Sequence, residues 1–161
     1  MIDVINLQRK VKLDTKQFRV FVQSLSPMVE EAEGRTFSVA FISDDRMRKL
    51  NSTFRGKDSA TDVLSFPHEV HEFVQSASFS LSSEDQEQAE ACILNATFLG
   101  DIVISAEQAA RQANENKLSV KNEIKQLILH GVLHLCGYDH ETDDGEMSAR
   151  ELELRDKLGI S

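Results

Sequence analysis

The amino-acid sequence predicts an α/β (α+β) fold in which a small, mostly parallel, four-stranded sheet is flanked by about five helices. Two observations lead to this prediction. Short runs rich in β-branched and aromatic residues alternate along the chain with longer segments that repeat apolar residues every three or four positions. The 161 residues, of which 40% are hydrophobic, are enough to fill one core. We therefore expect residues 1–161 to form a single domain.

The four expected strands are identified by different features. Residues 4–7 are a short β-branched run at the start of the chain. The second run alternates Phe37, Val39 and Phe41, as in a strand that buries one face. Pro67 ends the third run, and the fourth is an apolar triplet. The expected strands cover residues 4–7, 36–43, 62–66 and 102–104.

The five expected helices carry apolar residues at helical spacing, and most begin with a residue suited to capping. Pro27 predicts a kink or a break near the end of the first helix. Three glycines, Gly34, Gly137 and Gly159, stand where helices are expected to end. The capping candidates are Asp14 or Thr15, Ser43 or Asp44, Ser105 and Ser119. The expected helices cover residues 14–32, 44–55, 105–116, 119–137 and 142–158.

The chain is acidic overall, but its charge is unevenly distributed. The formal net charge of −9 excludes a uniformly basic nucleic-acid binder and leaves room for local basic patches. Residues 1–57 carry 11 Lys/Arg and 7 Asp/Glu, whereas residues 58–161 carry 7 and 20. The acidic part can bind a cation and the basic part can meet an anion, although an ordinary solvated surface also produces such asymmetry.

Cysteine usage and hydropathy predict a cytoplasmic protein with no membrane partner. Cys92 and Cys136 lack C-x-x-C spacing, so we expect neither a disulfide framework nor a cysteine zinc site. The N-terminal residues lack the pattern of a signal peptide, and no apolar stretch approaches the length of a membrane span.

Three of the five histidines, His130, His134 and His140, follow the spacing i, i+4, i+10. Residues four positions apart share one face of a helix, so His130 and His134 can direct their rings at one ion. Gly137 can adopt a positive φ and fold the chain back, which lets His140 supply a third nitrogen. Three neutral ligands leave a coordination position for water, as in catalytic zinc sites. We therefore expect one Zn²⁺ per chain.

The expected metal helix is zincin-like in its ligand spacing but lacks the glutamate that acts as general base in zincins. Gly131 occupies that position. A metallohydrolase acting on a peptide or a small molecule therefore remains an alternative without its usual proton acceptor. His68 and His71 also have metal-ligand spacing, but they lie in a polar segment with no third ligand nearby, so we expect them at the surface.

Three sequence blocks occur in a fixed order: L-N-x-x-F-R-x-x-D-x-x-T-D-V-L-S-F-P at residues 50–67, L-G-D-I-V-I at 99–104, and H-G-x-L-H-L-x-G-Y-D-H at 130–140. Together they resemble the YbeY family of metal-dependent endoribonucleases, which is associated with ribosomal RNA maturation. The resemblance implies a single endoribonuclease domain over residues 1–161, with zinc held by the three histidines named above. The polar segment at about 68–96 is longer than the family pattern and is expected to be a loop insertion.

The resemblance also marks Arg55 as functionally important. A guanidinium presents a planar fork suited to phosphate oxygens, so we predict Arg55 as the catalytic residue beside the zinc. The expected activity is zinc-dependent cleavage of single-stranded RNA in maturation and quality control of small-subunit ribosomal RNA. The expected partners are ribosomal RNA, the small ribosomal subunit and ribosome-associated proteins. A non-catalytic ribosome assembly factor with a structural zinc is the second alternative.

An acidic protein that binds RNA needs a local basic surface. We expect such a surface beside the metal cleft from Arg46, Arg48, Lys49, Arg55 and Lys57. Other residues near the site have simpler expected roles. Asp62 is expected to cap a turn rather than to orient an imidazole ring, and Asp139 could do either. Tyr138 is expected to pack in the core, and Cys136 is expected to be a buried thiol rather than a ligand.

Overall fold

The computed structural model describes residues 4–68, 98–139 and 141–160. The strands are β1 (Val4–Asn6), β2 (Thr36–Ile42), β3 (Val63–Pro67) and β4 (Phe98–Ser105). The α-helices are α1 (Thr15–Met28), α2 (Asp44–Arg55), α5 (Ala106–Glu115), α6 (Val120–Leu135) and α7 (Glu146–Leu158), and a short 3₁₀ helix, η1 (Glu30–Ala32), follows α1. None of the described helices is long and apolar enough to cross a membrane.

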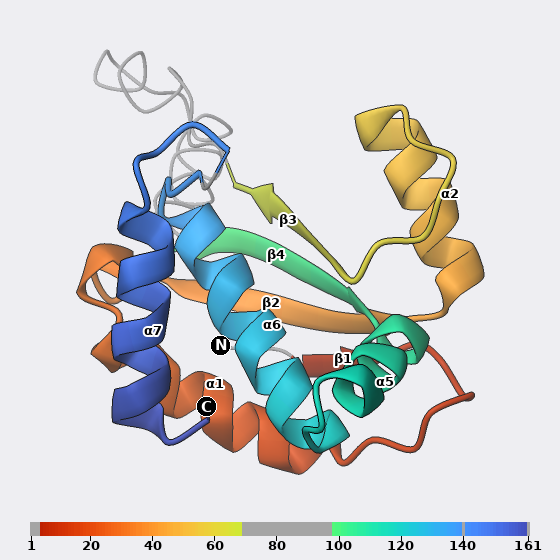
Figure 1. Ribbon diagram of the computed structural model, residues 1–161, viewed down its shortest axis with the longest axis horizontal. Helices are drawn as coiled ribbons and strands as arrows, with labels where there is room; N and C mark the ends of the chain where they lie inside the picture. The colour runs from red at the N-terminus through yellow and green to blue at the C-terminus, as the bar shows by residue number, and fades with distance from the viewer. Residues whose placement is uncertain (1–3, 69–97, 140, 161) are drawn as a thin grey trace, which may run out of the picture.

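The four strands form one mostly parallel sheet, as predicted, in the order β1-β2-β4-β3 (Figure 1). Strands β1, β2 and β4 run parallel, and Val39 of β2 is paired with Val4 on one side and Ile102 on the other. Strand β3 runs antiparallel to β4 and lies at the edge of the sheet. This edge position leaves one side of β3 open to form part of a site.

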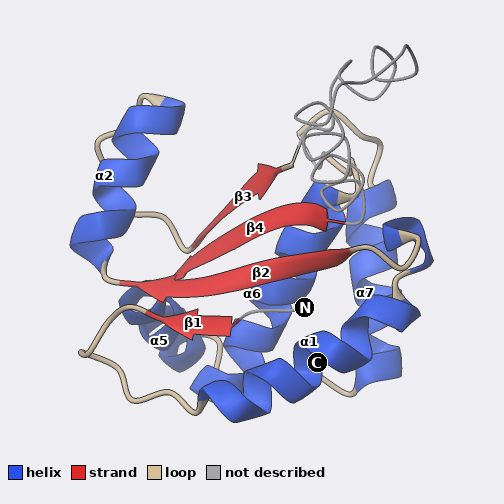
Figure 2. Ribbon diagram, turned by 180° about the vertical axis from the view of Figure 1, so that it is seen from behind, coloured by secondary structure: helices blue, strands red, loops and turns tan. Residues whose placement is uncertain are grey.

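One face of the sheet carries the main core. The alternate side chains Phe37, Val39 and Phe41 of β2, with Ile102 and Ile104 of β4, are fully buried on this face. Helices α1, α5, α6 and α7 supply most of the rest of the same apolar cluster, and they lie on this side of the sheet in both ribbon views (Figures 1 and 2). The core thus fixes α6, the helix that carries two of the predicted metal ligands.

The opposite face of the sheet is covered differently. Among the described elements, α2 packs there through a small cluster of Ile42, Met47 and Leu64. Figure 2 shows this face of β2 and β4 with α2 standing to one side, near β3. Helix α2 therefore lies beside the sheet edge at which the predicted site residues gather.

The helix starts follow the predicted caps closely. The hydroxyl oxygens of Ser43, Ser105 and Ser119 accept hydrogen bonds from backbone N–H groups three residues on, at 3.4, 3.3 and 3.1 Å. Helix α1 ends at Met28, one residue after Pro27, which confirms the predicted break.

Two elements begin about four residues away from their predicted starts. Helix α7 begins at Glu146 rather than at about residue 142, because the carboxylate of Asp143 accepts hydrogen bonds from the N–H groups of Gly145 and Met147 and holds a turn there. Strand β4 begins at Phe98 rather than at residue 102, and its Asp101 bonds to Ser38 of the neighbouring strand. From residue 69 onward, the predicted insertion lies outside the described residues.

Candidate active site

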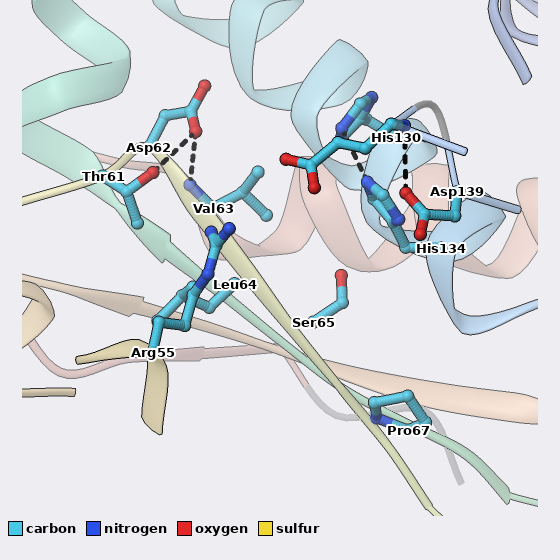
Figure 3. A pocket seen from close by; sticks show the side chains of 11 residues that line it. Arg55, Thr61, Asp62, Val63, Leu64, Ser65, Pro67, His130, His134 and Asp139 are labelled. Carbon is cyan, nitrogen blue, oxygen red and sulfur yellow. Dashed lines mark hydrogen bonds between the residues drawn. The ribbon is translucent and has the colours of Figure 1, made fainter. Parts of the chain in front are cut away.

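A cleft of about 590 Å³ lies along the open edge of β3. Its walls come from β3 with the residues before it, from α6 with the turn that follows, and from the last residue of α2 (Figure 3). Arg55, Asp62, His130 and His134 all line this cleft. The fold thus brings together three of the four predicted site residues, two of which lie far from Arg55 in the sequence. The fourth, His140, lies outside the described residues.

The two described histidines face each other as their spacing predicts. They stand one turn apart on α6, and their Nε2 atoms are 3.1 Å apart (Figure 3). Two nitrogens bound to one tetrahedral zinc at about 2.0–2.1 Å are separated by about 3.3 Å. The pair therefore already has the spacing of two ligands to one ion.

The other ring nitrogen of each histidine meets an acceptor. Nδ1 of His134 lies 3.0 Å from the carbonyl oxygen of Tyr138, and Nδ1 of His130 lies 3.4 Å from a carboxylate oxygen of Glu151. A carbonyl and a carboxylate only accept hydrogen bonds, so these contacts place the proton of each neutral ring on Nδ1. Both Nε2 lone pairs then point at each other, an arrangement that a cation between them stabilises. The residues present fit a metal ion.

Glu151 on α7 was not predicted as a site residue. Its side chain is 12% exposed and makes an ion pair of 2.9 Å with Arg155, one turn further along the helix. Burial opposes its ionisation, but the hydrogen bonds from His130 and Arg155 and the charge of Arg155 outweigh burial and hold the pKa of the Glu151 carboxyl below its ordinary value. The sequence did contain a signal. Glu151 lies between the buried Met147 and Leu154 on the apolar stripe of its helix, an unusual place for a carboxylate.

The chain turns back after α6 as expected. Gly137 has φ of 100°, in the region that favours glycine, and its N–H donates to the carbonyl of His134 at 3.0 Å. This turn carries the chain to Asp139, which also lines the cleft. Within the described ranges no three metal-ligating side chains come together, so His140 stays a predicted ligand.

The packing around Gly131 explains why the position of the zincin general base holds no glutamate. A Cβ atom built there would lie 2.9 Å from a methyl group of Ile102, which is fully buried on the sheet. The position next to the first histidine therefore points into the helix–sheet contact and away from the cleft. A zincin-type glutamate has no room at this position, which weighs against hydrolysis of a peptide by the zincin route.

Arg55 is exposed at the end of α2, just before Gly56, which caps the helix. In Figure 3 it lies across the cleft from the two histidine rings. It makes no ion pair with any residue that the structure describes. Its charge is therefore available to an anion in the cleft.

The basic residues of α2 that were expected to form one wall beside the metal lie at separate sites. Arg46 and Lys49 line a second cavity, and Arg48 is bound by Asp58 through two hydrogen bonds of 2.7 and 3.0 Å. Arg55 and Arg46 are nine positions apart, which at about 100° per residue places them on opposite sides of the helix. The prediction that these cations share one wall of the cleft was wrong, because clustering in sequence does not mean a shared helix face.

Asp62 is confirmed as a turn cap. Its carboxylate accepts from the N–H of Val63 at 2.8 Å and from the hydroxyl of Thr61 at 3.4 Å. Asp139 also holds a turn, because its carboxylate accepts from the N–H of Glu141 at 3.0 Å. Both carboxylates nevertheless line the cleft.

Three of the remaining candidates, Cys136, Tyr138 and His68, do not line the cleft. Burial raises the pKa of the Cys136 thiol to about 11, so it stays protonated at neutral pH and is no thiolate ligand. Tyr138 packs against the core, as predicted. His68 is exposed and contacts Phe98, whereas His71 and Cys92 lie outside the described residues.

Comparisons with known proteins identify the family of this chain. The family model described as "Endoribonuclease YbeY" matches residues 3–159. Proteins named Endoribonuclease YbeY are 38% identical in Nautilia profundicola, covering 86% of this chain and 84% of the relative, and 35% identical in Syntrophus aciditrophicus, covering 95% and 86%. The solution structure of a Thermotoga maritima protein matches with a TM-score of 0.59 at 26% identity, covering 99% of this chain and 90% of that one. The chain belongs to the YbeY family of endoribonucleases.

Proposed function

We propose that this protein is a zinc-dependent endoribonuclease that cleaves single-stranded RNA. Membership of the YbeY family supports the reaction class. The observation that carries the metal dependence is the pair of Nε2 atoms 3.1 Å apart, with both Nδ1 atoms directed at acceptors. His130 and His134 would hold the ion, with His140 as the predicted third ligand.

The two sides of the cleft have different roles in phosphodiester cleavage. When bound, zinc supplies an electrophile for a phosphoryl oxygen or lowers the pKa of a water molecule. On the opposite side, Arg55 binds the phosphate through its paired N–H groups and neutralises charge that develops during cleavage. Glu151 and the Tyr138 carbonyl keep the two imidazole rings in the orientation and tautomer that binding needs.

We further propose ribosomal RNA of the small subunit as the substrate, in maturation and quality control, with the small ribosomal subunit and ribosome-associated proteins as partners in the cytoplasm. This assignment rests on the resemblance of the three sequence blocks to a family associated with ribosomal RNA maturation. Exposed cations on α2 give the acidic chain a local surface for RNA.

The non-catalytic alternative requires zinc to hold the fold together. The described core argues for a different role, because α6 is anchored on the sheet by apolar side chains such as Ile124, Ile128 and Leu129, which are fully buried without any contribution from the metal. We therefore expect the metal-free chain to remain folded.

A combined metal and cleavage assay tests the proposal. The wild type is expected to contain one zinc per chain and to cleave a labelled single-stranded oligoribonucleotide. Chelation should abolish cleavage while circular dichroism stays native, and added zinc should restore it. His134→Ala should lose zinc and activity together, whereas His68→Ala, an exposed histidine outside the cleft, should keep both. Unfolding on chelation would favour a structural zinc, and undiminished cleavage by the chelated wild type would exclude the metal-dependent nuclease.

A further inference from the structure

A second cavity of about 420 Å³ lies between α2 and the less covered face of the sheet. Ala40, Ile42 and Val103 form its floor, and Leu50 and Phe54 of α2 form a wall. Phe54 is 63% exposed, so a large aromatic surface is offered to solvent. Because Phe54 continues the apolar lining of this cavity, the two together form a contiguous apolar groove of the kind found at binding sites.

The second cavity meets the catalytic cleft at the end of α2. Phe54 lines this cavity, and the next residue, Arg55, lines the cleft. The Phe54 ring also packs edge-to-face on Phe66 of β3, with ring centres 5.2 Å apart and an angle of 71° between the planes. The neighbours of Phe66 on the strand, Ser65 and Pro67, line the cleft. A chain bound at Arg55 can therefore pass directly onto Phe54.

The rim of the second cavity is cationic. Arg46 and Lys49 line it, and neither makes an ion pair with any residue in the part of the chain that the structure describes. A purely apolar ligand gains nothing from two cations, whereas a nucleotide presents both a flat base and an anionic phosphate. Aromatic stacking combined with basic side chains is the usual way in which proteins bind single-stranded nucleic acid.

We propose that Phe54 and this cavity bind a base of the RNA next to the phosphate held at Arg55, with Arg46 and Lys49 neutralising the flanking phosphates. The proposal rests on the proposed function and adds a reason for single-strand preference. A base stacked on Phe54 cannot at the same time stack within a duplex, so only unpaired RNA fills both the cleft and the cavity.

The absence of tryptophan from the chain allows a direct binding test. Phe54→Trp introduces a single tryptophan, which can be excited selectively over tyrosine, at the proposed stacking position. Titration of metal-free Phe54→Trp with a single-stranded oligoribonucleotide should quench its fluorescence to saturation, and a duplex of the same sequence should quench it much less. Leu152→Trp is the matched control, because Leu152 is also 63% exposed but lies on α7. It should show little quenching. Equal quenching in the two variants, or none at Phe54→Trp, would overturn the proposal.

Kinetics provide the second readout. Phe54→Ala should raise KM for a single-stranded oligoribonucleotide by about 10- to 100-fold, the usual loss of one stacked base. The value of kcat should change little, because stacking is the same in the ground and transition states. Phe54→Tyr should restore most of the affinity, and Leu152→Ala should match the wild type.

The two readouts separate this inference from the nuclease proposal. Quenching is measured without metal, so it decides the base-binding role whether or not the zinc-loaded protein cleaves the oligonucleotide. A protein partner at the cavity is the competing occupant. If Phe54→Ala leaves oligonucleotide binding unchanged but abolishes binding to RNA-free proteins of the small ribosomal subunit, the cavity docks a protein and the base-binding role is wrong.

Discussion

The two sides of the cleft are built in different ways. The histidine side stands on α6, whose sheet-facing side chains are buried and whose two histidine rings each contact an acceptor through Nδ1, Glu151 for His130 and the Tyr138 carbonyl for His134. The arginine side stands on the end of α2, where Phe54 and Arg55 are exposed and Arg55 makes no ion pair within the described residues. The histidine side is held in place by contacts within the protein, whereas the arginine side is exposed and free to contact a ligand.

On the proposed function, this difference separates metal binding from substrate binding. A metal ion needs ligands held within a few tenths of an ångström, which a buried helix with hydrogen-bonded rings provides. An RNA strand varies in sequence and conformation, and exposed cationic and aromatic side chains tolerate that variation. Substitutions on the two sides should therefore produce different kinetic and metal-binding signatures.

The largest effect is expected from Arg55→Ala. It should lower kcat for RNA cleavage by about 100- to 1000-fold, the usual loss on removing a donor that stabilises transition-state charge, with zinc content unchanged. Arg55→Lys should recover only part of the activity, because an ammonium group cannot form paired hydrogen bonds. Arg48→Ala is the control, since Arg48 is on the same helix but already paired with Asp58. Full activity of Arg55→Ala would show that the open side is not catalytic.

Glu151→Gln is expected to have the reverse effect of Arg55→Ala: it should weaken zinc binding and leave kcat nearly unchanged. The substitution keeps the shape of the side chain but removes the charge behind His130, so zinc affinity should fall by about tenfold. At saturating zinc, kcat should stay near the wild-type value, because Glu151 is a positioning residue. Competition with a chromophoric chelator measures the affinity directly. Glu153→Gln on the exposed side of the same helix is the control, and equal affinities in the two variants would remove Glu151 from the site.

The sequence predicted the parts of this site that are local in the chain. The spacing of His130 and His134 follows from helix geometry, and the serine caps follow from hydrogen bonds to N–H groups three residues away. Glu151 was missed because it comes from another helix, and only the packing of α7 on α6 brings it to His130.

The basic residues of α2 also show what local sequence cannot predict. Their closeness in sequence predicted one surface, but rotation around the helix sends Arg46 to the second cavity and Arg55 to the cleft. That separation could be read from the helix period alone. The position of the cleft relative to the helix depends on the antiparallel edge strand β3, which local sequence patterns do not specify.

A smaller effect is expected when the packing of α6 on the sheet is disturbed. Gly131→Ala places a methyl group against Ile102, and overpacking of this kind should exceed the gain in helix propensity, for a net loss of about 1 kcal/mol in the free energy of unfolding. In an Ile102→Ala background the same substitution should be neutral or stabilising, because the obstructing side chain is gone. Urea unfolding of the four proteins measures this coupling, and additive effects would show that the close approach does not constrain α6.

The smallest effect concerns the ion pair that attaches α7 to the segment after α1. Arg150 donates two hydrogen bonds to the carboxylate of Glu31, at 3.1 and 2.9 Å, and these hold the pKa of Glu31 below its ordinary value of 4.5. A lowered pKa stabilises the folded state above the unfolded pKa, and the contribution disappears as pH falls through the folded pKa. Glu31→Gln should therefore lower the free energy of unfolding by up to about 1 kcal/mol at neutral pH. The difference from wild type should shrink as the pH falls below 4.5. Urea unfolding across this range tests the sign, with Glu30→Gln as the exposed neighbouring control. A difference that grows on acidification would contradict the role of this pair in holding α7, and with it Glu151, in place behind His130.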